Sequence, residues 1–420
     1  VAATIFSMLV KLRSQKSNYL QMMMGLHLHA SGCPKRVINL LAASGMSVSH
    51  MTICTALKSL TANSLEEVRF QVKKRHFFLV YDNINIANRK YDQRSNNLDS
   101  FDNGTTSTIV LGEDIDPDQD VTVPPTISTF LLEQLDVIQF HLIDVLQRHF
   151  VTYGTPISIP SVEPLEVQET KTCPLRSLEI DQATISGNIE VLEKTMRDVL
   201  QLPEEWFNDY TKIIVAGDQL TISRIISLQE LRAADTTSFS RMQWALPLIQ
   251  LFHLQMVLCG TILRTHYGSF SSPGSLGFII SMLERKRLGM DTSNFHAADE
   301  LIRHTFDAMV RRLWEVEFRL EISDMRAYEF AMEYSNANAN AVLFLRDTLA
   351  YIELGAAIKA GDVGRIKNVL ETITVMFQAG GMKNYARELL RKAVLASLLI
   401  NTKGKENAWI PTDLYQEHNN

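Results

Sequence analysis

Apolar residues recur with a helical period over residues 1 to 75, so this region is predicted to be helical. Gly45 predicts a turn between two helices, and Ser49 behind it is a suitable N-cap for the second one. The side chains of this second helix that could contact DNA are His50, Thr52 and Lys58. The pattern fits a helix-turn-helix, but it also fits a plain helical hairpin, and both interpretations stay open.

Short apolar runs replace the helical period after residue 75. The run from His76 to Asn83 is apolar until it reaches an acid, as expected of a buried strand. Two more strands are predicted from Ile84 to Tyr91 and from Thr105 to Leu111, with a polar, turn-rich loop between them. Three successive strands predict an antiparallel meander.

Two further apolar runs occur later in the chain. The first predicts a strand from Lys212 to Ala216, followed by Gly217-Asp218 and a helix over residues 221–233. The second predicts a strand from Ala245 to His253 that leads into another helix. Because a helix connects them, we expect these two strands to be parallel neighbours joined by a right-handed crossover.

Residues 276 to 400 show a helical period almost throughout. The fold class predicted is therefore α/β (α+β), with one mixed sheet and a large helical block. We divide the chain into N-terminal helices (1–75), a mixed α/β core (76–275), a helical insertion (276–400) and a return segment to the core (401–420). The chain is expected to be part of a longer protein.

Composition and charge narrow the class of protein. The hydrophobic fraction of 46% and the charged fraction of 21% are those of a globular protein. The net charge of −6 gives no overall attraction for nucleic acid, so DNA binding would need local basic clusters. Three such clusters occur: Lys73 to Arg75, Arg285 to Arg287, and Arg311 with Arg312. Each is more simply explained as a solvated surface or a helix end.

Cysteines and hydropathy bear on the compartment. None of the four cysteines forms a C-x-x-C pair, which argues against a zinc ribbon or a secreted disulfide framework. The one long uncharged stretch, Trp244 to Leu263, contains Pro247 and polar side chains in its middle, so we expect a buried strand and helix there rather than a membrane span. An intracellular, nuclear location is expected, without a membrane partner.

Two acids end predicted strands, Asp82 and Asp218. Mg²⁺ and Mn²⁺ prefer oxygen ligands, and carboxylates on neighbouring strands supply them. Glu417 is the candidate third acid, with Asp413 as its alternative, and His253 is a further candidate. Each has a simpler explanation: Asp82 can start a turn, Asp218 can cap a helix, Glu417 can lie in a surface pair, and His253 can be a core residue.

The order of these elements resembles the ribonuclease-H-like fold of integrases and transposases. That fold has three antiparallel strands with an Asp on the first, a helix, a fourth strand with the second Asp, a fifth strand, and a last helix that bears a Glu. Some transposases place a helical insertion before the last helix, as residues 276 to 400 would be here. The resemblance implies a catalytic and metal-binding set of Asp82, Asp218 and Glu417.

Five stretches also resemble the signature blocks of an uncharacterised domain family that is widespread in mushroom-forming fungi and has spread like mobile elements. They are Tyr81-Asp82-Asn83-Ile84-Asn85, Gly217-Asp218-Gln219-Leu220-Thr221, Phe252-His253-Leu254-Gln255-Met256, Lys383-Asn384-Tyr385-Ala386 and Asp413-Leu414-Tyr415-Gln416-Glu417-His418-Asn419. The resemblance implies a transposon-associated protein, and it brings no established activity.

Our hypothesis from the sequence is a transposon-derived, DDE-type protein that cleaves or transfers DNA strands with Mg²⁺ or Mn²⁺. Whether activity is retained or lost stays open, and a homo-oligomer is a further expectation. Motifs of other chemistries are missing: the sequence has no G-x-x-x-x-G-K-[ST], G-x-G-x-x-G, G-x-S-x-G or H-E-x-x-H. The alternative is a non-catalytic helical scaffold that binds proteins. The placement of Asp82 relative to Asp218 discriminates between the two.

Overall fold

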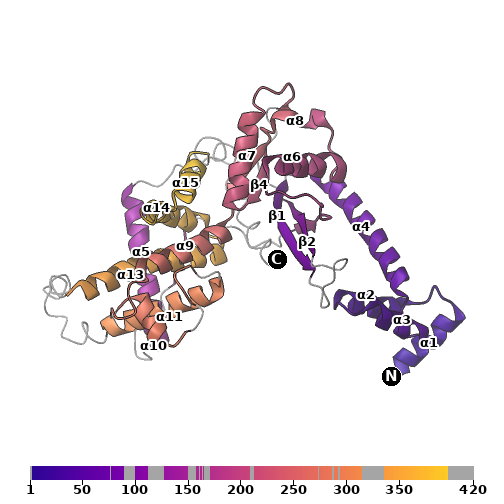
Figure 1. Ribbon diagram of the computed structural model, residues 1–420, viewed down its shortest axis with the longest axis horizontal. Helices are drawn as coiled ribbons and strands as arrows, with labels where there is room; N and C mark the ends of the chain where they lie inside the picture. Colours follow the sequence, from indigo (N-terminus) through magenta and orange to yellow (C-terminus); the bar gives the residue numbers. More distant parts are fainter. Residues whose placement is uncertain are drawn as a thin grey trace. The chain divides into compact units, whose positions relative to one another are not determined.

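The chain folds into two compact units. A computed structural model describes the residues outside 1, 76, 89–99, 112–126, 150–157, 160, 163, 165–170, 209–211, 273, 286–287, 292–293, 315–334 and 396–420. The first unit contains residues 1–74 and 195–202, and the second contains residues 75–194 and 203–420. Figure 1 labels the elements of both. The predicted return segment, 401–420, lies outside the described residues.

The first unit is helical, as predicted. Its α-helices are α1 (Ala2–Arg13), α2 (Tyr19–Ala30), α3 (Lys35–Ala43) and α4 (His50–Val72). Gly45 has a φ of +80°, which suits a turn residue without a Cβ. The Ser49 side chain accepts a hydrogen bond from the Thr52 amide at the start of α4. The predicted turn and cap are both confirmed, and α4 runs to Val72, past the helix end at about Leu60 that the sequence predicts.

The second unit contains a five-stranded mixed sheet. The strands are β1 (Phe77–Asn88), β2 (Ser100–Leu111), β3 (Lys171–Pro174), β4 (Ile213–Gly217) and β5 (Ala245–Ile249). Their order is β3-β2-β1-β4-β5. The β1–β2 and β2–β3 pairs are antiparallel, whereas β1–β4 and β4–β5 are parallel. The first strand therefore lies in the middle of the sheet, with the antiparallel half on one side and the parallel half on the other (Figure 1).

The expected adjacency of the first strand and the Lys212–Ala216 strand is confirmed, but the strand boundaries differ from those predicted. The separate strand predicted from Ile84 to Tyr91 is wrong, because β1 continues through Asp82 and stays paired with β2 from Phe77 to Asn88. A polar centre in a strand is tolerated where the partner strand satisfies its backbone. The third strand of the meander is β3, which lies far along the chain from β2.

The predicted strand from Ala245 to His253 is too long. The strand β5 ends at Ile249, and the helix α9 (Leu251–His266) begins two residues later. An apolar run does not by itself distinguish a buried strand from a buried helix, so the pattern could not locate this boundary. The parallel pairing of β4 with β5 is confirmed, with the helix α7 (Gln219–Leu231) between them in the chain.

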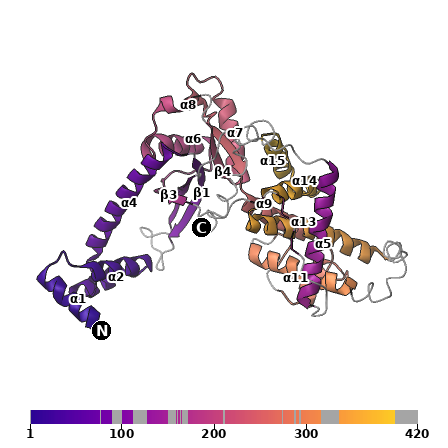
Figure 2. The same cartoon turned by 180° about the vertical axis from the view of Figure 1, so that it is seen from behind.

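The remaining described α-helices of the second unit are α5 (Ile127–His149), α6 (Ile185–Lys194), α8 (Ser238–Arg241), α10 (Leu276–Met282), α11 (Phe295–Leu313), α13 (Ser335–Ala360), α14 (Val363–Ala379) and α15 (Lys383–Leu395). The described residues between 276 and 400 form helices and no strand, which confirms the predicted helical block. Figure 2 shows α5 alongside α11 and α13, against which it packs.

One hydrophobic core joins the sheet to these helices. The strand side chains in it include Phe78, Val80, Ile214, Ala216 and Leu248, and they pack with buried residues of α9, α11, α13 and α14. On β1 and β4 these are alternate positions, so one face of the sheet is covered by the helices of the second half. No helix among the described residues is long and apolar enough to span a membrane, and the stretch Trp244–Leu263 forms β5 and α9.

Candidate functional site

Asp82 lies within β1, two residues past the last residue that pairs with the parallel strand β4. It is opposite Thr106 of β2, whose hydroxyl donates to the Asp82 carbonyl oxygen at 3.4 Å. Its side-chain Oδ1 accepts a hydrogen bond from the Asn83 amide at 2.7 Å. The side chain is partly exposed. The Asp82 carboxylate is thus bound by a backbone amide of its own strand, at the point where the apolar run ends.

Asp218 directly follows β4 and begins α7. Its Oδ1 accepts a hydrogen bond from the Thr221 amide at 2.7 Å, so it is the N-cap of α7. The glycine before it allows this close turn, because a Cβ at position 217 would lie 2.8 Å from Thr221 Cγ2. The simpler explanation considered for Asp218, a helix cap, is therefore realised in the structure.

Asp82, Asp218 and Gln250 form a row just beyond the last pairs of the parallel strands β1, β4 and β5. Val80 pairs with Ala216 at the end of the β1–β4 pairing, so Asp82 and Asp218 each lie two residues beyond it. Gly217 pairs with Ile249, so the next residue on each strand aligns Asp218 with Gln250. Neighbouring strands lie about 4.8 Å apart, and residues in one row point to the same face. The row continues the helix-covered face at the carboxyl end of the parallel strands.

Gln250 is the member of this row that the sequence interpretation missed. It is 1% exposed and has an extended backbone, and its backbone N–H donates to the Gly217 carbonyl oxygen at 3.2 Å. It occupies the N-cap position of α9 without capping it through its side chain. Neither Oε1 nor Nε2 has a hydrogen-bond partner among the described residues. The signal in the sequence was the first polar residue after the apolar segment Ala245–Ile249.

On the other face of the sheet, Tyr81 is fully buried and donates its hydroxyl to Asn188 Oδ1 of α6 at 2.8 Å. The Asn188 Nδ2 group donates in turn to the carbonyl oxygens of Gln182 and Thr184. Burial raises the pKa of Tyr81, and the negative charge of Asp218 adds to this effect. Tyr81 therefore stays neutral and anchors the strand beside the acids.

Tyr385 of α15 also lies within electrostatic reach of Asp218. Burial, with a smaller contribution from the Asp218 carboxylate, raises the pKa of Tyr385 to about 12. Its ring packs against Phe377 of α14 at a centroid distance of 5.6 Å. The helices α15 and α7 are in contact, so a segment far along the chain reaches the neighbourhood of the strand ends.

The other candidate residues stand as follows. His253 lies in the first turn of α9, three residues after Gln250, with its ring edge-on to Phe252 at 6.1 Å. Glu417 and Asp413 lie outside the described residues. Over the described part of the chain, no group of three or more His, Cys, Asp or Glu side chains is arranged to hold a metal ion. Two of the three predicted acids, Asp82 and Asp218, lie on or directly after adjacent parallel strands, each two residues past the last β1–β4 pair.

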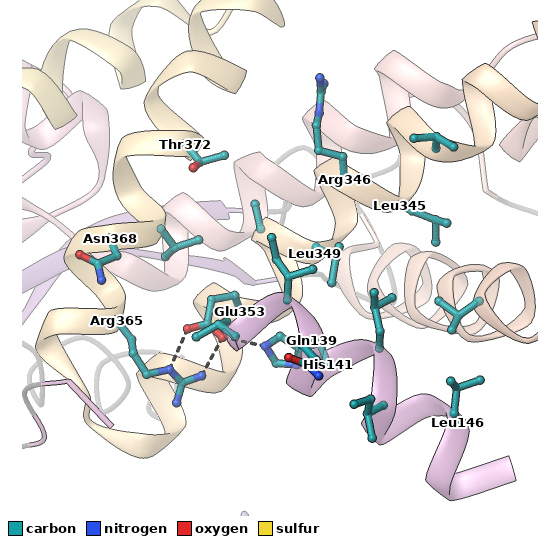
Figure 3. Close-up of a pocket in the computed structure, with 18 of the residues that line it drawn as sticks. Gln139, His141, Leu146, Leu345, Arg346, Leu349, Glu353, Arg365, Asn368 and Thr372 are labelled. Atoms are coloured by element: carbon teal, nitrogen blue, oxygen red, sulfur yellow. Dashed lines mark hydrogen bonds and ion pairs between the residues drawn. The ribbon is translucent and has the colours of Figure 1, made fainter. Parts of the chain in front are cut away.

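A second feature of the same unit is a pocket of about 860 Å³ between α5, α11, α13 and α14 (Figure 3). Its walls are mainly apolar, and its polar part is a buried network. Arg365 Nε and Nη2 donate to the two carboxylate oxygens of Glu353 at 2.7 Å each, and His141 Nε2 lies 2.7 Å from Glu353 Oε2 (Figure 3). These groups satisfy one another, so the pocket presents little unpaired charge.

The comparisons with known proteins give one match. A model described as a family of unknown function, DUF6589, matches residues 128–334 and 333–420. The matched ranges contain β3, β4, β5 and the helical block, whereas β1 with Asp82 lies before them. No curated protein and no solved structure matches the chain.

Proposed function

Because the chain belongs to the DUF6589 family, whose function is unknown, we propose a function from the candidate site. The protein would be a ribonuclease-H-like, DDE-type enzyme that cleaves or transfers DNA strands with Mg²⁺ or Mn²⁺. The observation that carries this proposal is the parallel pairing of β1 with β4, which ends two residues before Asp82 and Asp218. Such an enzyme would act on DNA inside the cell, in the nucleus.

The order of elements supports the proposal. The strands β1, with its Asp, and β2 come first; α5, β3, α6, β4 followed by Asp218, and β5 come next. The succession of strands agrees with the ribonuclease-H-like enzymes that the sequence resembles, whereas the helix α5 between β2 and β3 departs from it. The central position of β1 is essential to the argument, because it makes β1 the direct neighbour of β4.

The residues present fit a divalent cation. Two carboxylates in one row repel each other, and a cation between them relieves this repulsion. The carboxamide of Gln250 in the same row is buried, and neither of its polar atoms has a hydrogen-bond partner among the described residues. Asp82 and Asp218 would hold the cation, with Glu417, or alternatively Asp413, as the third acid. The cation would activate water or a 3′-hydroxyl and stabilise the leaving oxygen at phosphorus.

A thermal-shift titration with Mn²⁺ tests the site. A ligand that binds only the folded state raises the melting temperature, so the full chain is expected to gain stability in millimolar Mn²⁺. Asp82→Asn and Asp218→Asn should each abolish this gain, together with Mn²⁺-dependent nicking of supercoiled DNA. Asn is as good an N-cap as Asp, so Asp218→Asn keeps the start of α7 intact.

The matched control is Asp291→Asn, which removes a carboxylate that is exposed and lies 3.9 Å from Arg264. This variant should keep the whole Mn²⁺ response. If Asp82→Asn and Asp218→Asn respond to Mn²⁺ as the wild type does, these aspartates are not metal ligands and the proposed enzyme is refuted.

A non-catalytic scaffold is the second candidate, and one observation favours it. Both acids already have local roles, since Asp82 accepts from the Asn83 amide and Asp218 caps α7. A wild-type chain without any Mn²⁺ response would select this candidate over the enzyme.

A further inference from the structure

The pocket between α5, α11, α13 and α14 has the size and the walls of a ligand site. Its volume of about 860 Å³ lies in the range of pockets that hold small molecules, about 300–1,000 Å³. Its walls are mainly apolar and belong to the core of the second unit, with Leu146, Val310 and Val369 among the buried residues that form them. Water finds few hydrogen-bond partners in such a space, so an apolar ligand gains free energy by filling it.

The pocket is accessible from the surface. Two of its apolar lining residues are exposed, Ile138 of α5 by 38% and Val342 of α13 by 52%. Leu345, one turn after Val342 on α13, also lines the pocket and is only 8% exposed. The apolar wall therefore runs from the solvent into the core, and an apolar chain from solution can follow it inward.

The charged lining residues indicate the head group of the ligand. Glu353 and Arg365 neutralise each other and are both buried. Arg346, seven residues before Glu353 and thus ~10 Å away along α13, has a side chain that is 66% exposed and points away from this pair (Figure 3). Its Nε and Nη2 donate to Asp347 Oδ1, and Nη1 lies outside this contact. Because a guanidinium has five N–H donors, Arg346 can bind a second carboxylate at the exposed side of the pocket.

We propose that this pocket binds a single-chain amphiphile with a carboxylate head, of the class of the fatty acids. Its hydrocarbon chain fills the apolar interior, and its carboxylate meets Arg346 at the exposed side. An ammonium head would be repelled by the same guanidinium. A sugar or a nucleotide does not fit, because apolar walls leave most of its polar groups without partners. The proposal is independent of the proposed enzyme, since Asp82 and Asp218 do not line the pocket.

Calorimetric titration of the full chain with dodecanoate, below its micelle concentration, tests the proposal. Dodecanol and dodecyltrimethylammonium carry the same chain with a neutral and a cationic head. We expect saturable binding of one dodecanoate per chain, about threefold weaker binding of dodecanol, and still weaker binding of the ammonium. Each methylene removed from the carboxylate series should weaken binding about fourfold, because less apolar surface is buried.

The head-group contact is tested by Arg346→Gln. This variant should bind dodecanoate about threefold more weakly than the wild type and bind dodecanol equally well, so that the preference for the carboxylate disappears. The matched control is Arg387→Gln on α15. The Arg387 side chain is also 66% exposed and lies beside a buried acid, Glu388, but outside the pocket. The control should keep both affinities and the preference.

The location of the chain is tested by Ala350→Leu, which adds apolar atoms to a buried position of the wall. Both dodecanoate and dodecanol should then bind at least tenfold more weakly, because the added atoms occupy the space of the ligand. Without a ligand, the melting temperature of this variant should not fall, since the side chain extends into unfilled space. A clear fall would mean that the protein itself fills the pocket, and it would overturn the proposal.

Three other results would refute it. The first is a wild-type chain that shows no saturable binding of dodecanoate, and the second is an Ala350→Leu variant that binds it as the wild type does. The third is an Arg346→Gln variant that still prefers dodecanoate to dodecanol, which would remove the carboxylate head from the proposal. Asp82→Asn and Asp218→Asn should bind dodecanoate as the wild type does, so the outcome here is separate from that of the Mn²⁺ titration.

Discussion

The buried network of Glu353, Arg365 and His141 allows a quantitative prediction of stability. Arg365 is 2% exposed and Glu353 is 6% exposed, and two hydrogen bonds of 2.7 Å join them. Replacing Glu353 with Leu removes both bonds and the acceptor of His141, and it leaves the guanidinium charge buried without a counter-ion. Breaking a buried pair in this way costs about 3–5 kcal/mol.

The double variant Glu353→Leu/Arg365→Met tests the origin of that cost. It removes both charges and fills the space with apolar atoms, so its free energy of unfolding should lie within about 2 kcal/mol of the wild-type value. The two substitutions are therefore expected to be strongly non-additive, with a coupling of several kcal/mol. Equilibrium urea denaturation followed by tryptophan fluorescence measures this in the second unit, because all four tryptophans lie within residues 203–420.

The control is an ion pair of similar length on the surface. Lys194 Nζ lies 2.6 Å from Glu190 Oε1, but both side chains are about half exposed. Glu190→Ala should therefore change stability by less than about 0.5 kcal/mol. If Glu353→Leu were equally mild, or if the double variant lost the sum of the two single effects, the network would not act as a coupled buried unit and the reasoning would be wrong.

Two other predictions concern the turn after β4 and the dependence of stability on pH. Gly217→Ala places a Cβ 2.8 Å from Thr221 Cγ2 and should lower the free energy of unfolding by about 1–3 kcal/mol, as measured by urea denaturation. Adding Thr221→Ser removes that methyl group and should restore most of the lost stability. Burial would raise the pKa of Asp347, but hydrogen bonds from His266 and Arg346 outweigh it and hold the pKa below its usual range. The stabilisation by Asp347 is therefore complete above about pH 4, the pKa of an unfolded Asp, and is lost as pH falls through the lower pKa of the folded state. Melting curves of Asp347→Asn should accordingly show a weaker loss of stability below about pH 4 than those of the wild type. An equal loss in both proteins would contradict the lowered pKa of Asp347.

The parallel half of the sheet could be predicted from the sequence for a simple reason. The runs from Phe77 to Tyr81 and from Ile213 to Gly217 are short, apolar and ended by an acid, and the fold places them side by side. Strands that are buried on both faces have this pattern, and a helix between β4 and β5 makes their pairing parallel. The neighbouring placement of β1 and β4 follows from these local features.

The boundaries and the surroundings of the acids could not be predicted in the same way. The apolar run through Gln250 continues from β5 into α9, so its pattern contains no break at the point where the strand becomes a helix. The extension of β1 depends on pairing with β2, which is a tertiary contact. The proximity of Tyr385 to Asp218 joins residues far apart in the chain, and one sequence gives no signal for such a pair.

The central place of β1 also determines where this protein can be divided. The family match begins at residue 128, after β1 and β2 have already been completed. A fragment expressed from that boundary would keep β3, β4 and β5 but lose the two strands between β3 and β4. Its sheet would be split, the edge of β4 that normally pairs with β1 would be open, and such an edge invites association with other chains. The folding unit is therefore larger than the matched region, and an autonomous fragment has to include Phe77.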